Sequence, residues 1–354
     1  MRRTLGTLAL ASLVSLVLAS PMAAHGSSAR SSQARKALAW HQTRVGSDQE
    51  LRGLDAVNGR VAWVSGDEGG VWRSTDGGRH WKDVAPPHSS KLLFRDVEAT
   101  DRRHALLLAI GTRTASRIYR TSNGGRTWTT TFVNHNKLAF YDCMAMWPGG
   151  RVGLAVSDPV HNKFRVIRTT DGGRTWKVLP RRRMPRAKGE FGFAASGTCL
   201  VTAGHRRAWI ASGGAASRVF RTTDRGRSWS VADSTIPPAK AGGTFGLSFK
   251  TTSHGLAVGG DYTKPRKGAH ASAYTTNGGR TWHNGGRLGG YRSGVDWVPG
   301  APGVAIAVGT SGSDITKDGG RTWRTFGQGY DSVQCVHGVC WSSGSHGRVG
   351  RLLR

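Results

Sequence analysis

Short apolar runs recur along the chain at similar distances, and each of them ends in small residues. The runs consist largely of Ala, Val, Leu and Ile, which is the composition of buried strands. They occupy Ala62–Gly66, Ala105–Gly111, Gly153–Ser157, Ala208–Ser212, Gly255–Gly259 and Ala305–Gly309. The pattern predicts a central strand in each of six repeated units.

Further segments with strand character flank each of these runs. The segments before the runs predict a first strand in each unit, at Leu51–Val57, Phe94–Ala99, Phe140–Trp147, Phe191–Ala195, Phe245–Phe249 and Tyr291–Val298. A third strand follows the run, as at Val71–Ser74, Ile118–Thr121 and Val219–Thr222. A fourth strand begins at the next tryptophan, so that each unit forms a four-stranded antiparallel sheet.

One turn motif joins the third and fourth strands in every unit. It reads Ser or Thr, any residue, Asp or Asn, any residue, Gly, any residue, then Thr, Ser or His, and finally Trp. The six copies are Ser74–Trp81, Thr121–Trp128, Thr169–Trp176, Thr222–Trp229, Thr275–Trp282 and Thr316–Trp323. We call these segments the box turns.

Each position of a box turn has a local structural role. The Asp or Asn side chain accepts hydrogen bonds from backbone N–H groups of its own turn, and the Ser or Thr hydroxyl does the same. The glycines permit positive φ, and the Trp ring is buried between neighbouring sheets. We therefore assign the following residues to structure and not to catalysis: Asp76, Trp81, Asn123, Trp128, Asp171, Trp176, Asp224, Trp229, Asn277, Trp282, Asp318 and Trp323.

The two ends of the chain predict one more sheet. Three strands follow the last box turn, at Ser332–Val336, Val339–Ser342 and Val349–Leu353, and no box turn follows them. The segment Lys36–Trp40 resembles a fourth strand with nothing before it. Pairing the two ends closes a ring and removes exposed sheet edges. We expect an all-β, seven-bladed propeller over residues 36–354, whose last blade is completed by the N-terminal strand.

The N-terminus has the features of a secretory signal peptide. Arg2 and Arg3 precede an apolar run from Leu5 to Ala19, and small residues follow. We expect a signal peptide over residues 1–26 and a flexible leader over residues 27–35, which makes the protein secreted or extracytoplasmic. An uncleaved membrane anchor is the alternative, although the run is short for a bilayer; no later segment is long and apolar enough to be transmembrane.

Four cysteines in an exported chain are candidates for disulfides. A hairpin turn at His337-Gly338 would place Cys335 opposite Cys340 at a separation that a disulfide accepts. Cys143 and Cys199 could link two neighbouring blades, a pairing suggested only by counting. No Cys or His spacing typical of a metal site occurs, so we expect no metal.

The chain is strongly basic, with 51 Lys and Arg against 21 Asp and Glu and a net charge of +30. Such an excess attracts polyanions through long-range electrostatics. Nucleic acid, anionic cell-wall polymer and acidic lipid all qualify, but no helix-turn-helix, finger or RNA-binding signature predicts specific nucleic-acid binding. Arginines at repeated positions, such as Arg73 and Arg126, also allow a purely structural interpretation.

The box turns resemble those of the BNR/Asp-box propeller superfamily across nearly the whole mature chain. Strands ending in Ala-Val-Gly, followed by Thr-Asp-Gly-Gly-Arg-Thr-Trp, are most similar to the photosystem II assembly and stability factor group. The resemblance implies an exported scaffold that binds protein partners without catalysis or cofactors. Sialidases share the turns, but their Phe-Arg-Ile-Pro signature is absent here. Resemblance to them leaves Glu190, Asp142 and Asp331 as candidate catalytic residues.

First strands line the central channel of a propeller, so residues near their starts become candidates for ligand binding. They are Arg52, Arg95, Tyr141 and Arg292, to which loops after the second strands add Asp158, Asp261 and Tyr262. Guanidinium groups pair well with carboxylate or phosphate. Among the glutamates, we expect only Glu190 near the channel. The alternative is that the arginines merely form salt bridges with acids of a wet channel.

These observations predict a monomeric binding or assembly platform for a protein or anionic-polymer partner, such as a cell-wall polymer or polysaccharide. A glycoside hydrolase acting on an anionic sugar is the main alternative. A propeller-type oxidoreductase is a further one, although its repeat residues and period would differ from those here.

Overall fold

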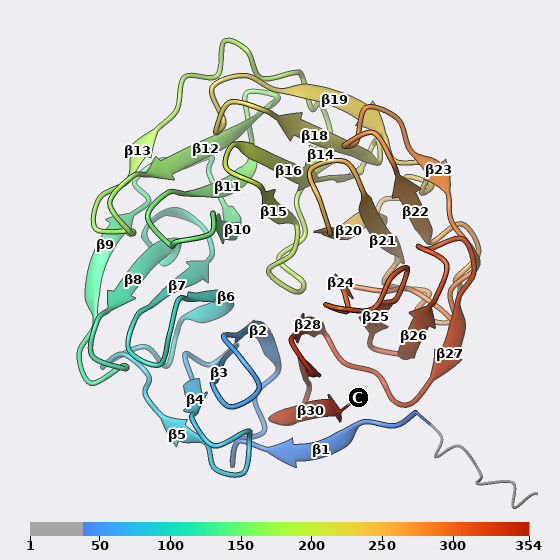
Figure 1. Ribbon diagram of the computed structural model, residues 1–354. Coiled ribbons are helices and arrows are strands. Elements are labelled where there is room, and N and C mark those ends of the chain that lie inside the picture. Colours follow the sequence, from blue (N-terminus) through green and yellow to red (C-terminus); the bar gives the residue numbers. More distant parts are fainter. Residues whose placement is uncertain (1–37, 354) are drawn as a thin grey trace, which may run out of the picture. The chain divides into compact units, whose positions relative to one another are not determined.

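Seven antiparallel sheets surround a central axis in the computed structural model, which describes residues 38–353 (Figure 1). Residues 1–37, and with them the expected signal peptide and leader, lie outside the described residues. A single 3-10 turn at Arg113–Ala115 is the only helix in the part of the chain that is described. The protein is a seven-bladed β-propeller, as the repeat pattern predicts.

The first three blades follow the chain in order. Blade 1 contains β2 (Leu51–Ala56), β3 (Ala62–Gly66), β4 (Val71–Ser74) and β5 (Lys82–Asp83). Blade 2 contains β6 (Leu93–Ala99), β7 (Ala105–Ile110), β8 (Arg117–Thr121) and β9 (Thr129–Val133). Blade 3 contains β10 (Tyr141–Met146), β11 (Gly153–Val160), β12 (Lys163–Thr169) and β13 (Lys177–Val178).

The remaining blades continue the same arrangement. Blade 4 contains β15 (Leu200–Ala203), β16 (Arg207–Ala211), β18 (Arg218–Thr222) and β19 (Ser230–Asp233). Blade 5 contains β20 (Gly242–Phe249), β21 (Gly255–Asp261), β22 (Ser272–Thr275) and β23 (His283–Asn284). Blade 6 contains β24 (Gly294–Trp297), β25 (Ala305–Gly309), β26 (Gly312–Thr316) and β27 (Arg324–Phe326). Blade 7 contains β28 (Ser332–Val336), β29 (Val339–Gly344), β30 (Arg348–Leu353) and β1 (His41–Arg44).

The two ends of the described chain close the ring, as predicted. Strand β1 pairs antiparallel with β30, with His41 opposite Arg351 and Arg44 opposite Arg348. The dark blue β1 and the red β30 lie side by side at the bottom of Figure 1. The strand begins at His41. Of the segment expected to form it, residues 36 and 37 lie outside the described residues, and Trp40 is buried against Phe326 with its Nε1 donating to Ser313 Oγ at 3.0 Å.

The box turns close their own hydrogen bonds. In the copy of blade 3, Thr169 Oγ1 accepts from the backbone N–H of Gly173 at 2.9 Å, and Asp171 Oδ1 accepts from that of Thr175 at 3.0 Å. Gly172 and Gly173 have φ of 74° and 77°, which glycine adopts without steric cost. The acidic side chains of the box turns are therefore hydrogen-bonded within their own turns, and each turn determines where the fourth strand begins.

One predicted first strand is wrong. The first strand of blade 4 is β15, whereas Phe191–Ala195, which alternates like a strand, belongs to an excursion before it. Its first part, β14 (Glu190–Phe191), pairs with β17 (Gly213–Gly214), and β17 pairs with β20, so that both extend the sheet of blade 5. Alternation alone could not distinguish a blade strand from a short pairing at the edge of another sheet.

Both disulfides are present. Cys335 and Cys340 face each other across the β28–β29 hairpin with a Cα separation of 4.0 Å, and Gly338 in its turn has φ of 80°. Cys143 on β10 is bonded to Cys199, which directly precedes β15, with a Cα separation of 5.9 Å. The second bond therefore links blade 3 to the entrance of blade 4.

Candidate functional site

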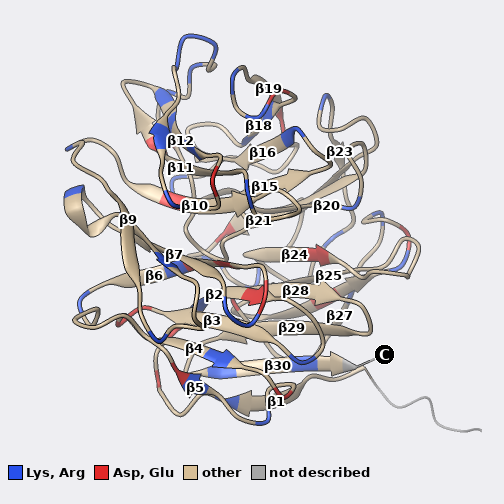
Figure 2. Cartoon of the chain, turned by 60° about the vertical axis from the view of Figure 1, so that its left-hand side comes forward, with Lys and Arg blue, Asp and Glu red and all other residues tan. Residues whose placement is uncertain are grey.

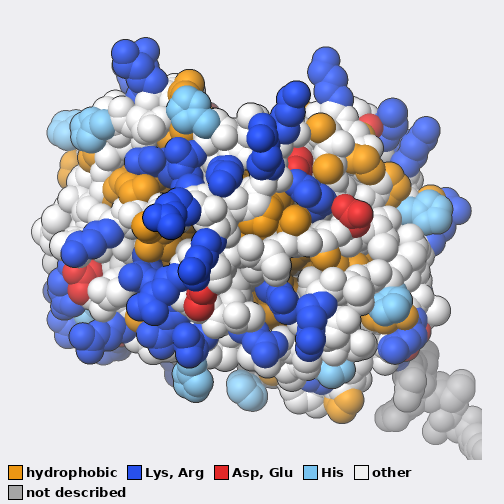
Figure 3. Space-filling view, turned by 90° about the horizontal axis from the view of Figure 1, so that it is seen from above, with side chains coloured by type: hydrophobic (Ala, Val, Ile, Leu, Met, Phe, Trp, Pro, Cys, Tyr) orange, Lys and Arg blue, Asp and Glu red, His pale blue; other side chains and the backbone are white. Residues whose placement is uncertain are grey.

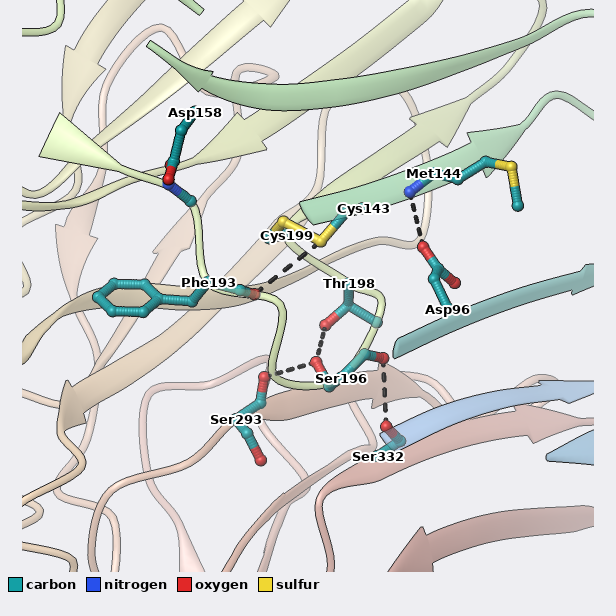
Figure 4. The surroundings of a disulfide bond; sticks show 11 residues. Asp96, Cys143, Met144, Asp158, Phe193, Ser196, Thr198, Cys199, Ser293 and Ser332 are labelled. Atoms are coloured by element: carbon teal, nitrogen blue, oxygen red, sulfur yellow. Dashed lines mark hydrogen bonds between the residues drawn. A yellow bond between two sulfur atoms is a disulfide. The ribbon is translucent and has the colours of Figure 1, made fainter. Parts of the chain in front are cut away.

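The segment Gly192–Cys199, which we call the channel loop, lies in the central channel as the yellow-green loop near the centre of Figure 1. Ser196 Oγ donates to the carbonyl of Ser293 at 2.8 Å, and Ser332 Oγ donates to the carbonyl of Ser196 at 3.2 Å (Figure 4). These bonds tie the loop to the first strands of blades 6 and 7.

Both ends of the channel loop are also held. The backbone N–H of Gly192 donates to Asp158 Oδ1 at 2.8 Å at one end, and the Cys143–Cys199 disulfide holds the other (Figure 4). Gly197 lies against Asp96 of blade 2, where an added Cβ would come within 2.7 Å of the carboxylate. One loop therefore contacts four blades and separates two cavities at opposite ends of the channel.

The first cavity, about 320 Å³, lies where the first strands begin, and we call it the basic mouth. It brings Arg52 and Arg95 together with Asp331, and Tyr262 forms part of its wall. Phe193 of the channel loop provides another part of the lining. Residues from blades 1, 2, 5 and 7 thus converge with the loop on one space.

The two arginines of the basic mouth retain unused hydrogen-bonding capacity. Arg52 Nη2 donates to Glu50 Oε1 at 2.8 Å, but the Nε atoms of Arg52 and Arg95 are buried without a hydrogen-bond partner. A buried N–H without an acceptor costs free energy until a ligand supplies one. The mouth is therefore suited to a group that carries acceptor oxygens and negative charge.

Asp331 gives the basic mouth a titratable group. It is 3% exposed, and burial raises its pKa to about 7, with Glu50 adding to the rise and Arg52 and Arg95 opposing it. The carboxyl group therefore changes charge near neutrality while the arginines remain cationic.

An aromatic cluster forms the apolar wall of the basic mouth. Phe193 stacks on Phe245 with ring centroids 3.5 Å apart, and Tyr291 meets Phe245 edge to face at 4.7 Å. Tyr262 lies at the rim with 53% of its surface exposed. An apolar wall beside two guanidinium groups suits a ligand with both an anionic group and a hydrophobic part.

The second cavity, about 270 Å³ at the other end of the channel, is lined by carboxyl groups that connect neighbouring blades. Asp55 accepts from Ala99 N, Asp96 from Met144 N at 2.6 Å, and Glu98 from Met146 N at 3.0 Å. Asp296 likewise accepts from Cys335 N at 2.7 Å. Each acid thus satisfies a backbone donor of the next blade. No group of three or more potential metal ligands occurs among residues 38–353.

The other predicted site residues lie outside the basic mouth. Arg292 is fully buried and its Nε donates to Asp314 Oδ2 at 2.6 Å. Glu190 is held by Ser212, whose Oγ donates to Oε2 at 2.7 Å, and by an ion pair with Arg218.

Four more predicted site residues, Tyr141, Asp142, Asp158 and Asp261, make their contacts outside the basic mouth. Tyr141 is buried edge to face against Phe132, with ring centroids 5.1 Å apart. Burial raises the pKa of Asp142 well above the usual range, and the neighbouring Asp158 adds to the rise. Asp261 accepts from Thr263 and pairs with Lys264 at 3.3 Å. The basic mouth therefore gathers Arg52, Arg95, Tyr262 and Asp331 from the predicted set.

Sequence reasoning missed several residues of the two cavities. The expectation that only Glu190 of the glutamates approaches the channel is wrong, since Glu98 lines the second cavity and Glu50 pairs with Arg52. Glu50 precedes β2, whose pairing with β3 shifts register between Leu51 and Gly53, so the alternation of a strand could not have placed it beside Arg52. Phe193 could not have been found either, because the channel loop has no repeated counterpart.

Comparisons with known proteins agree on the fold. No family model matches the chain, and no curated protein matches it. A solved structure of YCF48 bound to D1 peptide matches with a TM-score of 0.60 and 13% identity, over 89% of this chain and 95% of that one. Virginiamycin B lyase from Staphylococcus aureus matches with a TM-score of 0.63 and 11% identity, over 89% and 99%. The GH74 xyloglucanase from Xanthomonas campestris matches with 0.61 and 16%, over 88% and 53%.

These similarities define the class of the protein, a seven-bladed propeller, and at such identities they extend no further than the fold. Within residues 38–353, no helix is both long and apolar enough to span a membrane.

Proposed function

We propose that the protein is a binding platform that recognises an acidic group of a protein partner at the basic mouth. The observation that supports this most is that Arg52 and Arg95, whose buried Nε atoms have no hydrogen-bond partner, together line a cavity with an aromatic wall. A carboxylate of a peptide, with an apolar neighbour to pack on Phe245 or Tyr262, matches both features.

The proposal also covers the family of the protein, its export and its oligomeric state. We place the chain with BNR/Asp-box propellers of the photosystem II assembly-factor type, on the basis of its box turns. The YCF48 structure bound to D1 peptide gives an example of peptide binding on this fold. We also propose export by a signal peptide over residues 1–26 and a monomeric state, and the two disulfides suit an oxidising compartment.

The hydrolase alternative receives less support from the arrangement of carboxyl groups. Glycosidases of the common kind need two carboxyl groups flanking one bond. Among the candidates, Asp331 lines the basic mouth, while Glu190 is paired with Arg218 and Asp142 is buried behind Gly192. Glu50 is the remaining acid near Asp331, and it is paired with Arg52.

The test is binding of short fluorescent peptides that differ only in their content of acidic residues. The variant Arg52→Ala/Arg95→Ala should lose about tenfold or more in affinity for acidic peptides, because two charge-assisted hydrogen bonds are removed. The control is Lys91→Ala/Lys137→Ala, which removes the same charge from two exposed loops. Equal affinity of the two variants would contradict the proposal. Glycoside turnover that depends on Asp331 would favour the hydrolase.

A further inference from the structure

A second cationic surface lies on the face of the propeller that carries the box turns. At successive blade boundaries, an arginine from one blade packs on the glycine pair of the next box turn. Arg73 Nη1 donates to the carbonyl of Gly124 at 3.0 Å, Arg120 Nε to that of Gly172 at 3.0 Å, and Arg351 lies against Gly77. These arginines come from third strands, at positions marked in blue on β4 and β30 in Figure 2.

Each of these arginines meets a second arginine from the neighbouring blade. Burial lowers the pKa of Arg120 and proximity of Arg174 lowers it further; the same holds for Arg351 beside Arg79. Such groups of arginines occur at five consecutive boundaries, from the one between blades 7 and 1 to the one between blades 4 and 5. In this order they are Arg351 with Arg79, Arg73 with Arg102 and Arg126, Arg120 with Arg174, Arg168 with Arg227 and Arg225, and Arg221 with Arg280 and Arg207. We call this set the arginine arc.

The arc ends where the repeated arginine is replaced. Tyr274 occupies its position in blade 5, and Ile315 occupies it in blade 6. The cationic surface therefore runs around part of the ring and has two ends, which is the shape that a linear ligand would follow.

The arc has little counter-charge within the protein. None of the ion pairs among residues 38–353 involves an arginine of the arc. The nearest acids are the box aspartates, and these are committed to their own turns, as Asp171 is to Thr169 and Thr175. Figure 3 shows the same imbalance over one edge of the propeller, where Lys and Arg far outnumber Asp and Glu.

A groove of about 460 Å³ between blades 1 and 2 concentrates this charge. It is lined by Arg73, Lys82, Arg102, Arg103 and Arg126. Its one acidic residue, Asp83, uses Oδ1 to accept from the backbone N–H of Ala85 at 2.9 Å. Five cations around one groove exceed what a single carboxylate would neutralise, and they suit a densely charged group such as phosphate.

The arc and the basic mouth are on opposite faces. Box turns join third to fourth strands, and Arg102 and Arg103 lie between the first and second strands of blade 2, so both belong to one face. The basic mouth lies at the starts of first strands, which is the other face in an antiparallel sheet. The buried carboxyl groups of Asp55, Glu98 and Asp296 line the channel at the face of the arc.

We propose that the arginine arc binds a linear phosphate-bearing polymer, whose successive phosphates occupy successive blade boundaries with the groove between blades 1 and 2 as the strongest position. A chain that reaches several boundaries gains affinity from each additional one without new kinds of contact. This second binding activity is separate from the recognition of an acidic protein partner at the basic mouth.

The experiment titrates wild-type protein with fluorescent inorganic polyphosphate of long chain length, tripolyphosphate and poly-glutamate at several salt concentrations. The arc variant is Arg102→Glu/Arg103→Glu/Arg126→Glu, whose side chains are exposed and support no ion pair. The matched control, Lys91→Glu/Lys137→Glu/Lys188→Glu, makes the same change of net charge in exposed loops that lead toward the first strands. Circular dichroism and thermal melting verify that each variant is folded.

We expect the arc variant to bind long polyphosphate at least tenfold more weakly than the control variant does. Its salt dependence should also fall, by roughly 0.7 in the slope of log K against log salt for each phosphate that the variant no longer neutralises, as for flexible polyanions. Tripolyphosphate should bind wild type more weakly than the long chain. Equal losses of affinity in the two variants would overturn the proposal, since net charge alone would then explain binding. Equal affinity for poly-glutamate of matched charge would overturn the assignment of phosphate. A second arc variant, Arg174→Glu/Arg227→Glu/Arg280→Glu, replaces the first if that one does not fold.

Discussion

At the scale of single residues, the charge of the basic mouth depends on one carboxyl group. Asp331 is buried beside Arg52, Arg95 and Glu50, and its pKa of about 7 lies far above that of an exposed aspartate. When it is protonated, the arginines are available to an anionic ligand. When it is ionised, it competes with that ligand for the same cations.

This arrangement predicts that acidic peptides bind more tightly at about pH 5.5 than at about pH 8.5. If the bound anion raises the pKa of Asp331 by about one more unit, the affinity changes by about tenfold. Peptide titrations across this range measure the effect. The variant Asp331→Asn should bind equally well at both pH values, and a retained pH dependence in it would place the titrating group elsewhere.

The box turns make a second prediction at this scale. Asp318 accepts from the backbone N–H groups of Arg321 and Thr322 and from the hydroxyl of Thr322. Asp318→Ala leaves these donors to solvent and should lower the free energy of unfolding by about 1 kcal/mol. Chemical denaturation measures the loss. Asp48→Ala, at an exposed carboxylate with one long ion pair, is the control and should change stability by less than about 0.5 kcal/mol.

The acid dependence of the same turn has a defined sign. Desolvation raises the pKa of Asp318, but the hydrogen bonds that its carboxylate accepts from Thr322, Thr316 and Arg321 together outweigh this effect and lower the pKa. The stabilisation it provides is therefore present above the pKa of the unfolded chain and is lost as the pH falls through the lower, folded pKa. The difference in stability between wild type and Asp318→Ala should shrink in acid.

At the scale of structural elements, the channel loop departs from the repeated plan. Hydrogen bonds of Ser196 to blades 6 and 7 and the disulfide of Cys199 hold it across the axis. Its position determines the floor of both cavities, because Phe193 lines one and Gly197 lines the other. The geometry of the basic mouth therefore depends on a segment that contributes no strand to its own blade.

The two disulfides should differ in their contribution to stability. Cys143–Cys199 closes 56 residues and Cys335–Cys340 closes 5. In the chain-entropy account, their loss costs up to about 4 and about 2 kcal/mol, respectively. Denaturation of Cys143→Ser/Cys199→Ser and Cys335→Ser/Cys340→Ser measures both.

The readout that distinguishes the channel loop is hydrogen exchange. Loss of the Cys143–Cys199 bond should increase exchange in residues 192–199, whereas loss of the hairpin bond should leave that segment unchanged. Similar exchange in both variants would mean that the hydrogen bonds of Ser196 suffice to hold the loop.

Local signals explain why most elements could be predicted from the sequence. The hydrogen bonds of a box turn are made by its own side chains, and an apolar run such as Ala305–Gly309 is buried along its whole length. Both features therefore leave a local pattern in the sequence. The pattern misassigns Phe191–Ala195 because Phe191 pairs with Gly213 of β17, and the adjoining Ser196 bonds to Ser293 of blade 6, so that the partners come from distant parts of the chain. It misplaces Arg292 for a similar reason, since its partner Asp314 comes from the third strand of the same blade.

At the scale of the whole molecule, the ring depends on the pairing of its two ends. Val45 N–H donates to the carbonyl of Gly347, and alternate residues of a strand point the same way, so the N–H of Thr43 faces β30 while that of Gln42 faces outward. Thr43→Pro should therefore cost about 2 kcal/mol and lower the melting temperature by several degrees. Gln42→Pro is the matched control. An equal loss of stability in both variants would mean that the hydrogen bonds between β1 and β30 do not contribute as described.

The two proposals assign different binding chemistry to the two faces of the molecule. One offers Arg52 and Arg95 beside an aromatic wall, and the other offers the arginine arc around a channel that is lined by buried carboxyl groups. A small acidic ligand fits the first, and a long polyanion follows the second. The two activities should accordingly respond to different substitutions.

The most direct test of the basic mouth is the fluorescence anisotropy of one labelled acidic peptide, titrated with wild type, Arg52→Ala/Arg95→Ala, and the arc variant Arg102→Glu/Arg103→Glu/Arg126→Glu. We predict a loss of about tenfold or more in the first variant and a change of less than about threefold in the second, despite its larger change of net charge. A greater loss in the arc variant than in the mouth variant would contradict the account.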